Sequence, residues 1–270
     1  MNTDKEFNEL LWEFYDKHGR HDLPWRLPEA NGQFDPYKIV VSELMLQQTQ
    51  VQRVIPKFHD FLQMFPDVTT LAQAPLAEVL KAWSGLGYNR RAKFIWHTAQ
   101  QIQQEFKGIF PDTITELVTL AGIGKNTAGA VMAYAFNRPE VFIETNVRTV
   151  YIHHFFQDHT SVSDAELYDS VKRTLDHEHP REFYWAIMDY GSNLKQTVGN
   201  LNKFSSTYNK QSKFEGSKRQ VRGQVLRILA DRPLSLAELS DQINDDRLEM
   251  VLQDLVSEKL ITQANGKFAL

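Results

Sequence analysis

Two glutamates stand among apolar residues, where a carboxyl group is able to do acid–base chemistry. Glu43 lies in SELMLQQTQV, residues 42–51, within a predicted helix that is otherwise rich in apolar residues. Such surroundings raise the pKa of a carboxyl and make it a proton donor at neutral pH. Glu144 lies in FIETNV, residues 142–147, and leads into another apolar helix. Alone, each is better explained as a solvated helix residue or, for Glu144, as a negative charge at a helix N-terminus.

A glycine hairpin precedes Glu144 and suits the phosphate of a substrate. Gly122-Ile123-Gly124-Lys125 opens a helix that the apolar spacing predicts from about Asn126 to Phe136. A hairpin of this kind presents backbone N–H groups with little side-chain bulk. A second hairpin, GLGY at residues 85–88, is followed by the basic start of another helix. Most GxG sequences are ordinary turns, so neither hairpin is diagnostic by itself.

The elements that must position these residues are helical. Up to residue 194 the apolar spacing follows the helical period and almost nothing reads as a strand. The aromatic run FYWAIMDY at residues 183–190 is predicted to lie in the core. We therefore predict an all-α fold for this part of the chain.

The composition changes near Lys195 and divides the chain into three parts. Residues 195–217 are polar and basic and have no helical period, which predicts a loop-like linker. Beyond it, three helices are expected at about 221–230, 235–243 and 247–259, followed by a hairpin around Asn265-Gly266. We predict a helical domain over 1–194, a basic linker over 195–217 and a winged-helix-like domain over 218–270.

Composition excludes several classes of function. The chain has 270 residues, of which 42% are hydrophobic, and no cysteine, so disulfides, thiolate catalysis and cysteine-ligated iron–sulfur clusters are excluded. His153, His154 and His159 lack carboxylate or cysteine neighbours, so no metal site is predicted. No run approaches the roughly 20 apolar residues of a membrane span, and the acidic N-terminus is no signal peptide, so a cytoplasmic protein is expected. The net charge of -4 does not indicate a nucleic-acid-binding protein, although a chain with this net charge can still carry a local basic patch.

Seven runs together resemble the adenine DNA glycosylases, the MutY-like branch of the helix-hairpin-helix base-excision superfamily. The runs occur in the same order and at similar spacing over about Leu23 to Ser192: PWR, DPYK, SELMLQQTQV, KAWSGLGYNRRA, LAGIGKNTAGAV, ETNVRTV and WAIMDYGS. The resemblance implies two helical lobes with a base pocket in the cleft between them. It also implies an enzyme that flips adenine out of double-stranded DNA carrying a mismatched or damaged base pair and cuts its glycosidic bond.

The resemblance assigns a role to each matching residue. Glu43 matches the acid that protonates adenine, Glu144 the carboxylate that stabilises the oxocarbenium-like sugar, and Asn146 a polar residue beside it. Gln48 and Tyr88 match side chains that enter the base stack. The other candidates are phosphate-binding residues of the two hairpins (Arg90, Arg91, Gly122, Gly124, Lys125 and Thr127) and base-pocket residues (Trp25, Arg26 and Asn126).

Some of these residues have simpler explanations. The alternative for Trp25 and Arg26 is a packing tryptophan beside a surface arginine, and the alternative for Arg90 and Arg91 is a solvated helix face. Asp189 is expected to be a structural cap.

The chain departs from the family pattern at four places. Glu144 replaces the family's aspartate, which places the carboxylate one methylene further out, and a misplacement of ~1 Å can cost on the order of 100-fold in rate. Asn126 stands where the lyase branch has its Schiff-base lysine, so a monofunctional glycosylase is expected. The positions of the cluster cysteines are taken by Lys195, Asn202, Ser205 and Gln211, so we expect no iron–sulfur cluster and no other cofactor. In the family a large C-terminal domain reads 8-oxoguanine. We expect the winged-helix-like tail to stand in its place here, which leaves the preference for an oxidised partner base open.

We therefore predict a monomeric, monofunctional glycosylase that excises adenine opposite 8-oxoguanine or guanine. Two alternatives stay open: a glycosylase for a deaminated or alkylated purine, and a non-catalytic binder of damaged DNA. Glu43 and Asn146 favour catalysis, because a protein that only binds DNA has no need of them.

Overall fold

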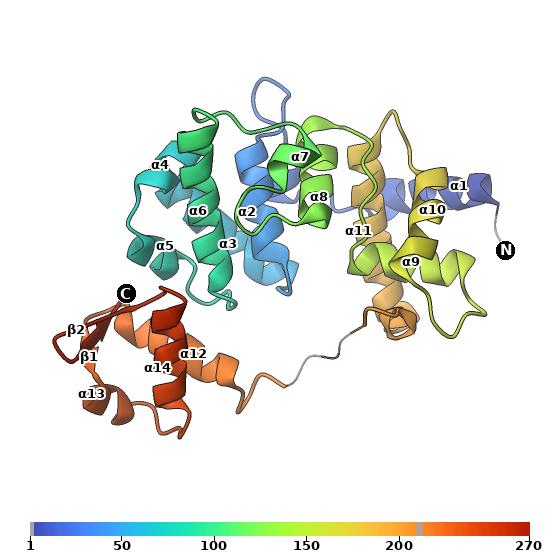
Figure 1. Ribbon diagram of the computed structural model, residues 1–270. Helices are drawn as coiled ribbons and strands as arrows, with labels where there is room; N and C mark the ends of the chain where they lie inside the picture. The colour runs from blue at the N-terminus through green and yellow to red at the C-terminus, as the bar shows by residue number, and fades with distance from the viewer. Residues whose placement is uncertain (1–2, 209, 211–212) are drawn as a thin grey trace. The chain divides into compact units, whose positions relative to one another are not determined.

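The computed structural model describes residues 3–208, 210 and 213–270 (Figure 1). Its regular structure up to residue 208 is helical, apart from one bridge between Val162 and Ser205. The helices in this part are α1 (Asp4–His18), η1 (Pro24–Arg26), α2 (Pro36–Leu46), α3 (Val51–Met64), α4 (Val68–Gln73), α5 (Leu76–Ala82), α6 (Arg90–Glu105), α7 (Ile114–Leu117), α8 (Lys125–Phe136), α9 (Thr145–Phe155), α10 (Asp164–Thr174), α11 (Pro180–Thr197) and η2 (Leu201–Phe204). The all-α prediction is confirmed. The chain forms two compact units, as the two-lobed prediction requires.

The first unit consists of Met1–Val40, Asp112–Thr119 and Ile123–Lys210 and is built around α11. Helices α1, α8 and α9 pack against α11, which begins at Pro180, a residue suited to the first turn of a helix. The aromatic run predicted for the core is buried here, with Phe183 and Tyr184 fully covered. Gly191 lets α9 approach closely, because a Cβ atom at this position would lie 2.7 Å from the carbonyl oxygen of Asn146.

The second unit consists of Val41–Pro111, Leu120–Gly122 and Gln211–Leu270. In its first segment α6 packs against α4 and α5, over a core that includes Phe61, Leu71 and Trp83. The rings of Trp83 and Phe61 form an edge-to-face pair, with an interplanar angle of 85° and 5.9 Å between their centroids, a favourable aromatic geometry. The second unit therefore joins segments that are far apart in the sequence.

The C-terminal part of the second unit is a small helical domain with a three-stranded sheet. Its elements are α12 (Lys218–Leu229), β1 (Leu234–Ser235), α13 (Leu236–Ser240), α14 (Leu248–Ser257), β2 (Thr262–Ala264) and β3 (Lys267–Ala269). The strand order is β1-β3-β2, all antiparallel, and Phe268 faces Leu234 on one side and Gln263 on the other. The three predicted helices and the hairpin around Asn265-Gly266 are present. Strand β1 was not predicted, because two residues are too few to show a strand period.

The predicted linker is partly wrong. Lys195 lies inside α11, and Leu201–Phe204 forms η2 rather than a loop. Asn202 is buried and donates to the Thr149 hydroxyl at 2.7 Å, and Ser205 pairs with Val162. Much of this segment is therefore folded onto α9, and a solvated tether does not describe it. Gln211, also assigned to the linker, lies outside the described residues.

No helix within the described residues is long and apolar enough to cross a membrane. A search of the same residues finds no group of three or more His, Cys, Asp or Glu side chains that suits a metal ion.

Candidate active site and DNA-binding residues

Glu43 is half-buried on α2, between the buried residues Ser42 and Leu44. The helix ends three residues later at Leu46, and the chain turns through Gln48, which has a left-handed φ of 56°. An L-residue other than asparagine or aspartate rarely adopts this conformation without support from its surroundings. Glu43 and Gln48 are thus fixed to one helix end within the second unit.

Arg91 provides that support, and the prediction that it contacts phosphate is wrong for this conformation. It is only 5% exposed. Its guanidinium donates to the carbonyl oxygens of Leu44, Met45 and Gln47 at 2.5, 2.9 and 2.6 Å. The same group donates to the Thr49 hydroxyl and to the carbonyls of Leu86 and Gly87, at 3.1–3.2 Å. Burial lowers the pKa of Arg91 to about 10, so it remains charged at neutral pH.

Tyr88 stands at the end of the GLGY hairpin, opposite the same arginine. Its φ is 46°, its side chain is exposed, and Arg91 lies 5.5 Å from its ring centroid. Gly87 has φ 72°, and a Cβ atom at this position would meet nothing within 4 Å. The hairpin therefore offers an open surface beside Tyr88. Arg90, predicted to bind phosphate, is exposed and forms an ion pair with Glu258 at 2.7 Å.

The hairpin at residues 122–125 has the geometry that its glycines predict. Gly122 has φ 76°, and a Cβ atom there would lie 2.6 Å from the Phe94 side chain. Gly124 is the N-cap of α8 and is exposed, as is Lys125. These positions leave the first amides of α8 open to an anion. Thr127 is buried, which fits packing within α8 and speaks against direct contact with a phosphate.

Glu144 is the N-cap residue of α9 in the first unit, where a carboxylate interacts favourably with the helix dipole. Its side chain is half-buried. Burial raises the pKa of Glu144, and the positive charge of Arg148 opposes this only in part. Arg148 is itself held by Asp164 through two hydrogen bonds of 2.7 Å. A carboxyl whose ionised form is made costly by the fold is typical of a functional site.

Asn126 holds the segment that leads into Glu144. Its amide nitrogen donates to the Ile143 carbonyl at 2.8 Å, and its amide oxygen accepts from the Ile143 N–H at 3.3 Å. The residue was predicted to line the base pocket. In the structure its side chain instead binds the backbone, because both the nitrogen and the oxygen of its amide form hydrogen bonds with Ile143, the residue before Glu144. Sequence reasoning missed this role, since nothing in the spacing shows which backbone an asparagine will meet.

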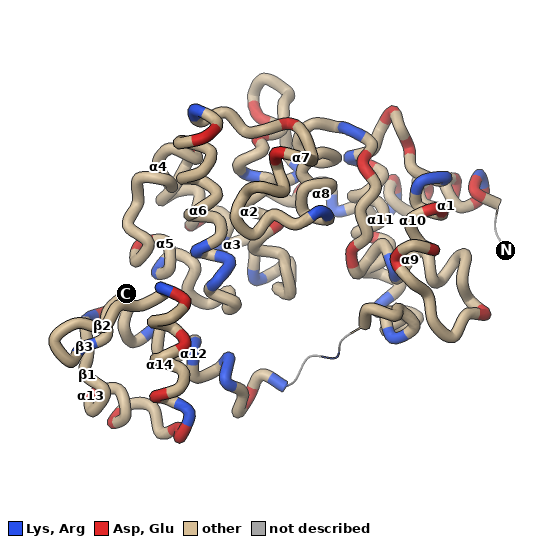
Figure 2. The backbone as a smooth tube through the Cα atoms, in the orientation of Figure 1, with Lys and Arg blue, Asp and Glu red and all other residues tan. Residues whose placement is uncertain are grey.

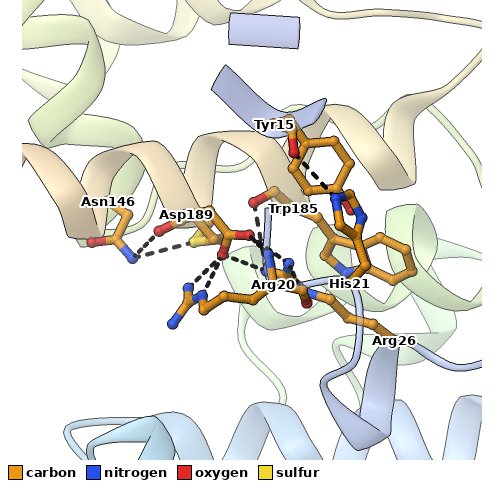
Figure 3. A network of polar contacts seen from close by, with 8 residues as sticks. Tyr15, Arg20, His21, Arg26, Asn146, Trp185 and Asp189 are labelled. Atoms are coloured by element: carbon orange, nitrogen blue, oxygen red, sulfur yellow. Dashed lines mark hydrogen bonds and ion pairs between the residues drawn. The ribbon is translucent and has the colours of Figure 1, made fainter. Parts of the chain in front are cut away.

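A buried ion-pair network organises the remaining candidates of the first unit (Figure 3). Arg26 donates to the two carboxylate oxygens of Asp189 at 2.8 and 2.9 Å, and Arg20 donates to the same carboxylate from its backbone N–H and its Nε. Arg26 is 5% exposed and Asp189 4%, so the surface-arginine reading is wrong, as is the reading of Asp189 as a cap, because it lies in the interior of α11. Trp25 is buried beside them.

Asn146, in the first turn of α9, contacts α11 next to Asp189. Its amide donates to the Met188 carbonyl at 3.3 Å, directly before Asp189 (Figure 3). This contact ties the first turn of α9, which follows Glu144, to α11. The structure therefore brings Asn126, Glu144 and Asn146 together around the start of α9 and places Arg26 and Asp189 in the support behind it.

Comparison with known proteins identifies the class of protein to which this fold belongs. Residues 41–179 match the family described as HhH-GPD superfamily base excision DNA repair protein, and the chain belongs to this superfamily. A solved structure of a thermostable thymine-DNA glycosylase is similar to it with a TM-score of 0.61 and 24% identity, over 70% of this chain and 86% of that one. At this identity the likeness shows the fold.

Relatives in sequence narrow the class further. The adenine DNA glycosylase of Mycobacterium tuberculosis (strain ATCC 25618 / H37Rv) is 33% identical, over 97% of this chain and 92% of its own length. The adenine DNA glycosylase of Buchnera aphidicola subsp. Acyrthosiphon pisum (strain APS) is 40% identical over 70% of this chain. The chain spans about half the length of the Buchnera relatives it matches, 53% in this case. The resemblance found in the seven sequence runs is thus confirmed.

The buried Asp189 pair yields a prediction about stability. Burial alone would raise the pKa of Asp189, but the hydrogen bonds and charge of Arg26 and the charge of Arg20 outweigh it and hold the pKa below the usual 3.8. Asp189→Asn leaves Arg26 buried without a countercharge, and we expect it to lower the free energy of unfolding at pH 7 by about 3–5 kcal/mol. The difference in free energy of unfolding between wild type and variant is greatest above pH 3.8. It becomes smaller as the pH falls through the folded-state pKa of Asp189.

Urea unfolding followed by circular dichroism at pH 7, 5 and 3 measures this difference. The matched control is Asp112→Asn, which breaks the exposed ion pair with Arg138 and should cost less than about 1 kcal/mol. Equal losses in the two variants would show that burial does not set the strength of the Asp189 pair.

The Asn126 contact yields a prediction about local order. Asn126→Ala removes both hydrogen bonds to Ile143, so the amides of residues 142–145 should exchange with deuterium about 5- to 10-fold faster, since one hydrogen bond is worth about 1 kcal/mol. Hydrogen–deuterium exchange read by mass spectrometry measures this, with Lys125→Ala at the neighbouring exposed position as control. Unchanged exchange in Asn126→Ala would mean that other contacts hold Glu144.

Proposed function

We propose that the chain is a monofunctional DNA glycosylase that excises adenine from double-stranded DNA in which adenine stands opposite 8-oxoguanine or guanine. The observation that carries the proposal is the set of hydrogen bonds made by Arg91. They fix the end of the helix that bears Glu43, the turn at Gln48 and the hairpin that leads to Tyr88 in one unit. A proton donor and two wedge residues on one framework are what excision of a flipped base requires.

Binding of DNA rests on backbone amides and exposed cations. The start of α8 presents its first N–H groups through Gly122 and Gly124, and Lys125 stands beside them. Such a helix N-terminus attracts a phosphate without reading sequence. Gln48 and Tyr88 then enter the base stack, and their left-handed backbone conformations hold both side chains at the tips of turns. Unstacking costs a few kcal/mol, least where the base pair is already mismatched.

Chemistry follows from the division between two carboxyl groups. Glu43 donates its proton to a ring nitrogen of adenine, and the bonding electrons of the glycosidic bond leave with the neutral base. The sugar becomes an oxocarbenium-like cation, which the ionised Glu144 stabilises until water adds to it. The water loses a proton as the abasic site forms, and uptake of a proton from solvent returns Glu43 to its acid form. The cation also restores the ionised form of Glu144, because a positive charge opposes the effect of burial on its pKa.

Cleavage of the DNA strand is not part of the proposed reaction. A lyase needs an amine that forms a Schiff base with the sugar, and Asn126 supplies an amide that is already bonded to Ile143. The proposed enzyme needs no cofactor for hydrolysis and acts as a monomer on chromosomal DNA.

Base release from labelled duplexes tests the proposal. Adenine is placed opposite 8-oxoguanine, guanine, cytosine or thymine, and hot alkali reveals abasic sites under single-turnover conditions. We expect release opposite 8-oxoguanine and guanine, reduced at least 100-fold by Glu43→Gln, because loss of a general acid costs about 10²- to 10⁴-fold. Glu144→Asp should change the rate up to 100-fold in either direction, since it moves the carboxylate by about 1 Å.

Two outcomes would redirect the proposal. Release from duplexes carrying hypoxanthine or an alkylated purine, with none from any adenine duplex, would make the chain a glycosylase for another lesion. Tight binding without release from any duplex would make it a binder of damaged DNA. Trapping of a covalent complex by borohydride would contradict the monofunctional reaction.

A further inference from the structure

A basic groove lies within the second unit, beside the residues proposed as wedges. Its volume is about 1000 Å³. One wall is the GLGY hairpin with the start of α6, the other is α12, and Gln47 and Gln48 also line it. Seven basic side chains and two acidic ones line the groove. An anionic ligand therefore suits it.

The two acids are already neutralised by the walls. Glu258 accepts from Arg90 at 2.7 Å and from both terminal nitrogens of Arg222, at 3.1 and 2.6 Å. Its backbone carbonyl accepts from Lys93 at 2.5 Å. Asp254 pairs with Lys218. These contacts fasten α12 and α14 to the start of α6 and leave a groove whose charge is positive.

Charge is separated between the helices of the C-terminal domain. Helix α12 carries Lys218, Arg219, Arg222 and Arg227 and no acidic residue, whereas α14 carries Glu249 and Asp254 and no basic residue (Figure 2). In many DNA-binding domains of this helical type a late helix enters the major groove. An acidic helix repels phosphates, so α14 is unsuited to this role and α12 is the helix that suits DNA.

Arg219 links α12 to the wedge. Its guanidinium donates to the Tyr88 hydroxyl at 2.6 Å and lies 5.7 Å from the centroid of the Tyr88 ring. A neutral phenol is a weaker acceptor than a phosphate, because hydrogen bonds to an ionised acceptor are roughly twice as strong. A phosphate that enters beside Tyr88 is therefore able to replace the phenol as the partner of Arg219.

We propose that the groove between the GLGY hairpin and α12 binds the phosphate backbone of a DNA strand, with Arg219 and Arg227 as the phosphate-contacting residues of α12. The C-terminal domain then acts as a second wall of the DNA-binding surface, and Arg219 exchanges Tyr88 for a phosphate when DNA binds. This inference rests on the proposed function only in taking duplex DNA as the ligand and Tyr88 as the wedge.

Salt-dependent binding of the full chain tests the groove. Fluorescence anisotropy of a labelled duplex is measured between 50 and 200 mM KCl, for one duplex with a central adenine–guanine mismatch and one fully paired. Arg219→Gln with Arg227→Gln should weaken binding of both duplexes about 10-fold. The slope of log K against log[salt] should become shallower by about 1–2, since each lost phosphate contact removes about 0.9.

Two controls make the result specific. Lys172→Gln with Lys267→Gln removes the same charge from α10 and from β3 of the winged-helix-like domain, and neither residue lines the groove. This control should bind like wild type, and an equal loss in it would overturn the groove. Arg227→Gln alone, at an exposed position, should make the slope shallower by about 1 if the double variant does not fold.

The outcomes separate this inference from the proposed function. Unchanged affinity and slope in the α12 variants, with adenine still released by wild type, would overturn the groove and leave the glycosylase standing. Weaker binding in the α12 variants without adenine release by wild type would support the groove and reject the adenine reaction. If the α12 variants lost affinity for the mismatched duplex but not for the fully paired one, the arginines would recognise a base and not the phosphate backbone. This result would overturn the proposal.

Discussion

One buried guanidinium holds together the working parts of the second unit. Arg91 satisfies the carbonyl groups that a helix end leaves unpaired at α2, and it also binds two carbonyls of the GLGY hairpin. Two turns with left-handed residues, Gln48 and Tyr88, would otherwise depend on local preferences that oppose them. The cation is desolvated, but its acceptors are numerous and well placed, which is the condition under which a buried charge is tolerated.

In the first unit a buried ion pair holds the helix ends in the corresponding way. Asp189 in α11 gathers Arg20 and Arg26, while the preceding residue, Met188, receives the amide of Asn146. The start of α9 is therefore held from two sides, by α11 through Asn146 and by α8 through Asn126, which binds the residue before Glu144. A carboxylate at such a place is fixed by backbone contacts on both sides of it.

The sequence predicts the parts of the molecule that depend on local rules. Helices follow from apolar spacing, and the two glycine hairpins follow from backbone conformations that favour glycine. At Gly122 the close approach of Phe94 also leaves no room for a side chain. The partners of charged residues do not follow from local rules. Arg90 and Arg91 look equivalent as neighbours at a helix start, but the helical turn of about 100° between them points one outward and buries the other. Arg26 and Asp189 are 163 residues apart, so only the fold reveals their pairing.

The folded segment after α11 shows the same limit. Asn202 and Ser205 stand in a polar, basic run that reads as a linker, yet both are buried. Their burial depends on an acceptor in α9, the Thr149 hydroxyl, and on the backbone of Val162. A small polar residue gives no signal of such a contact until its partner is known.

The second unit is discontinuous along the chain, because it combines residues 41–111 with residues beyond 211. A ribosome needs about 5–20 s to add the roughly 100 intervening residues at 5–20 residues per second. During this interval the nascent chain presents the GLGY hairpin and the start of α6 without α12 and α14. Glu258, which pairs with Arg90 and Arg222, follows Arg90 by 168 residues and is made after α12. The wall that carries the wedge is thus completed only after α14 has been made, and ribosomes that stall before α14 would release chains with that basic surface uncovered.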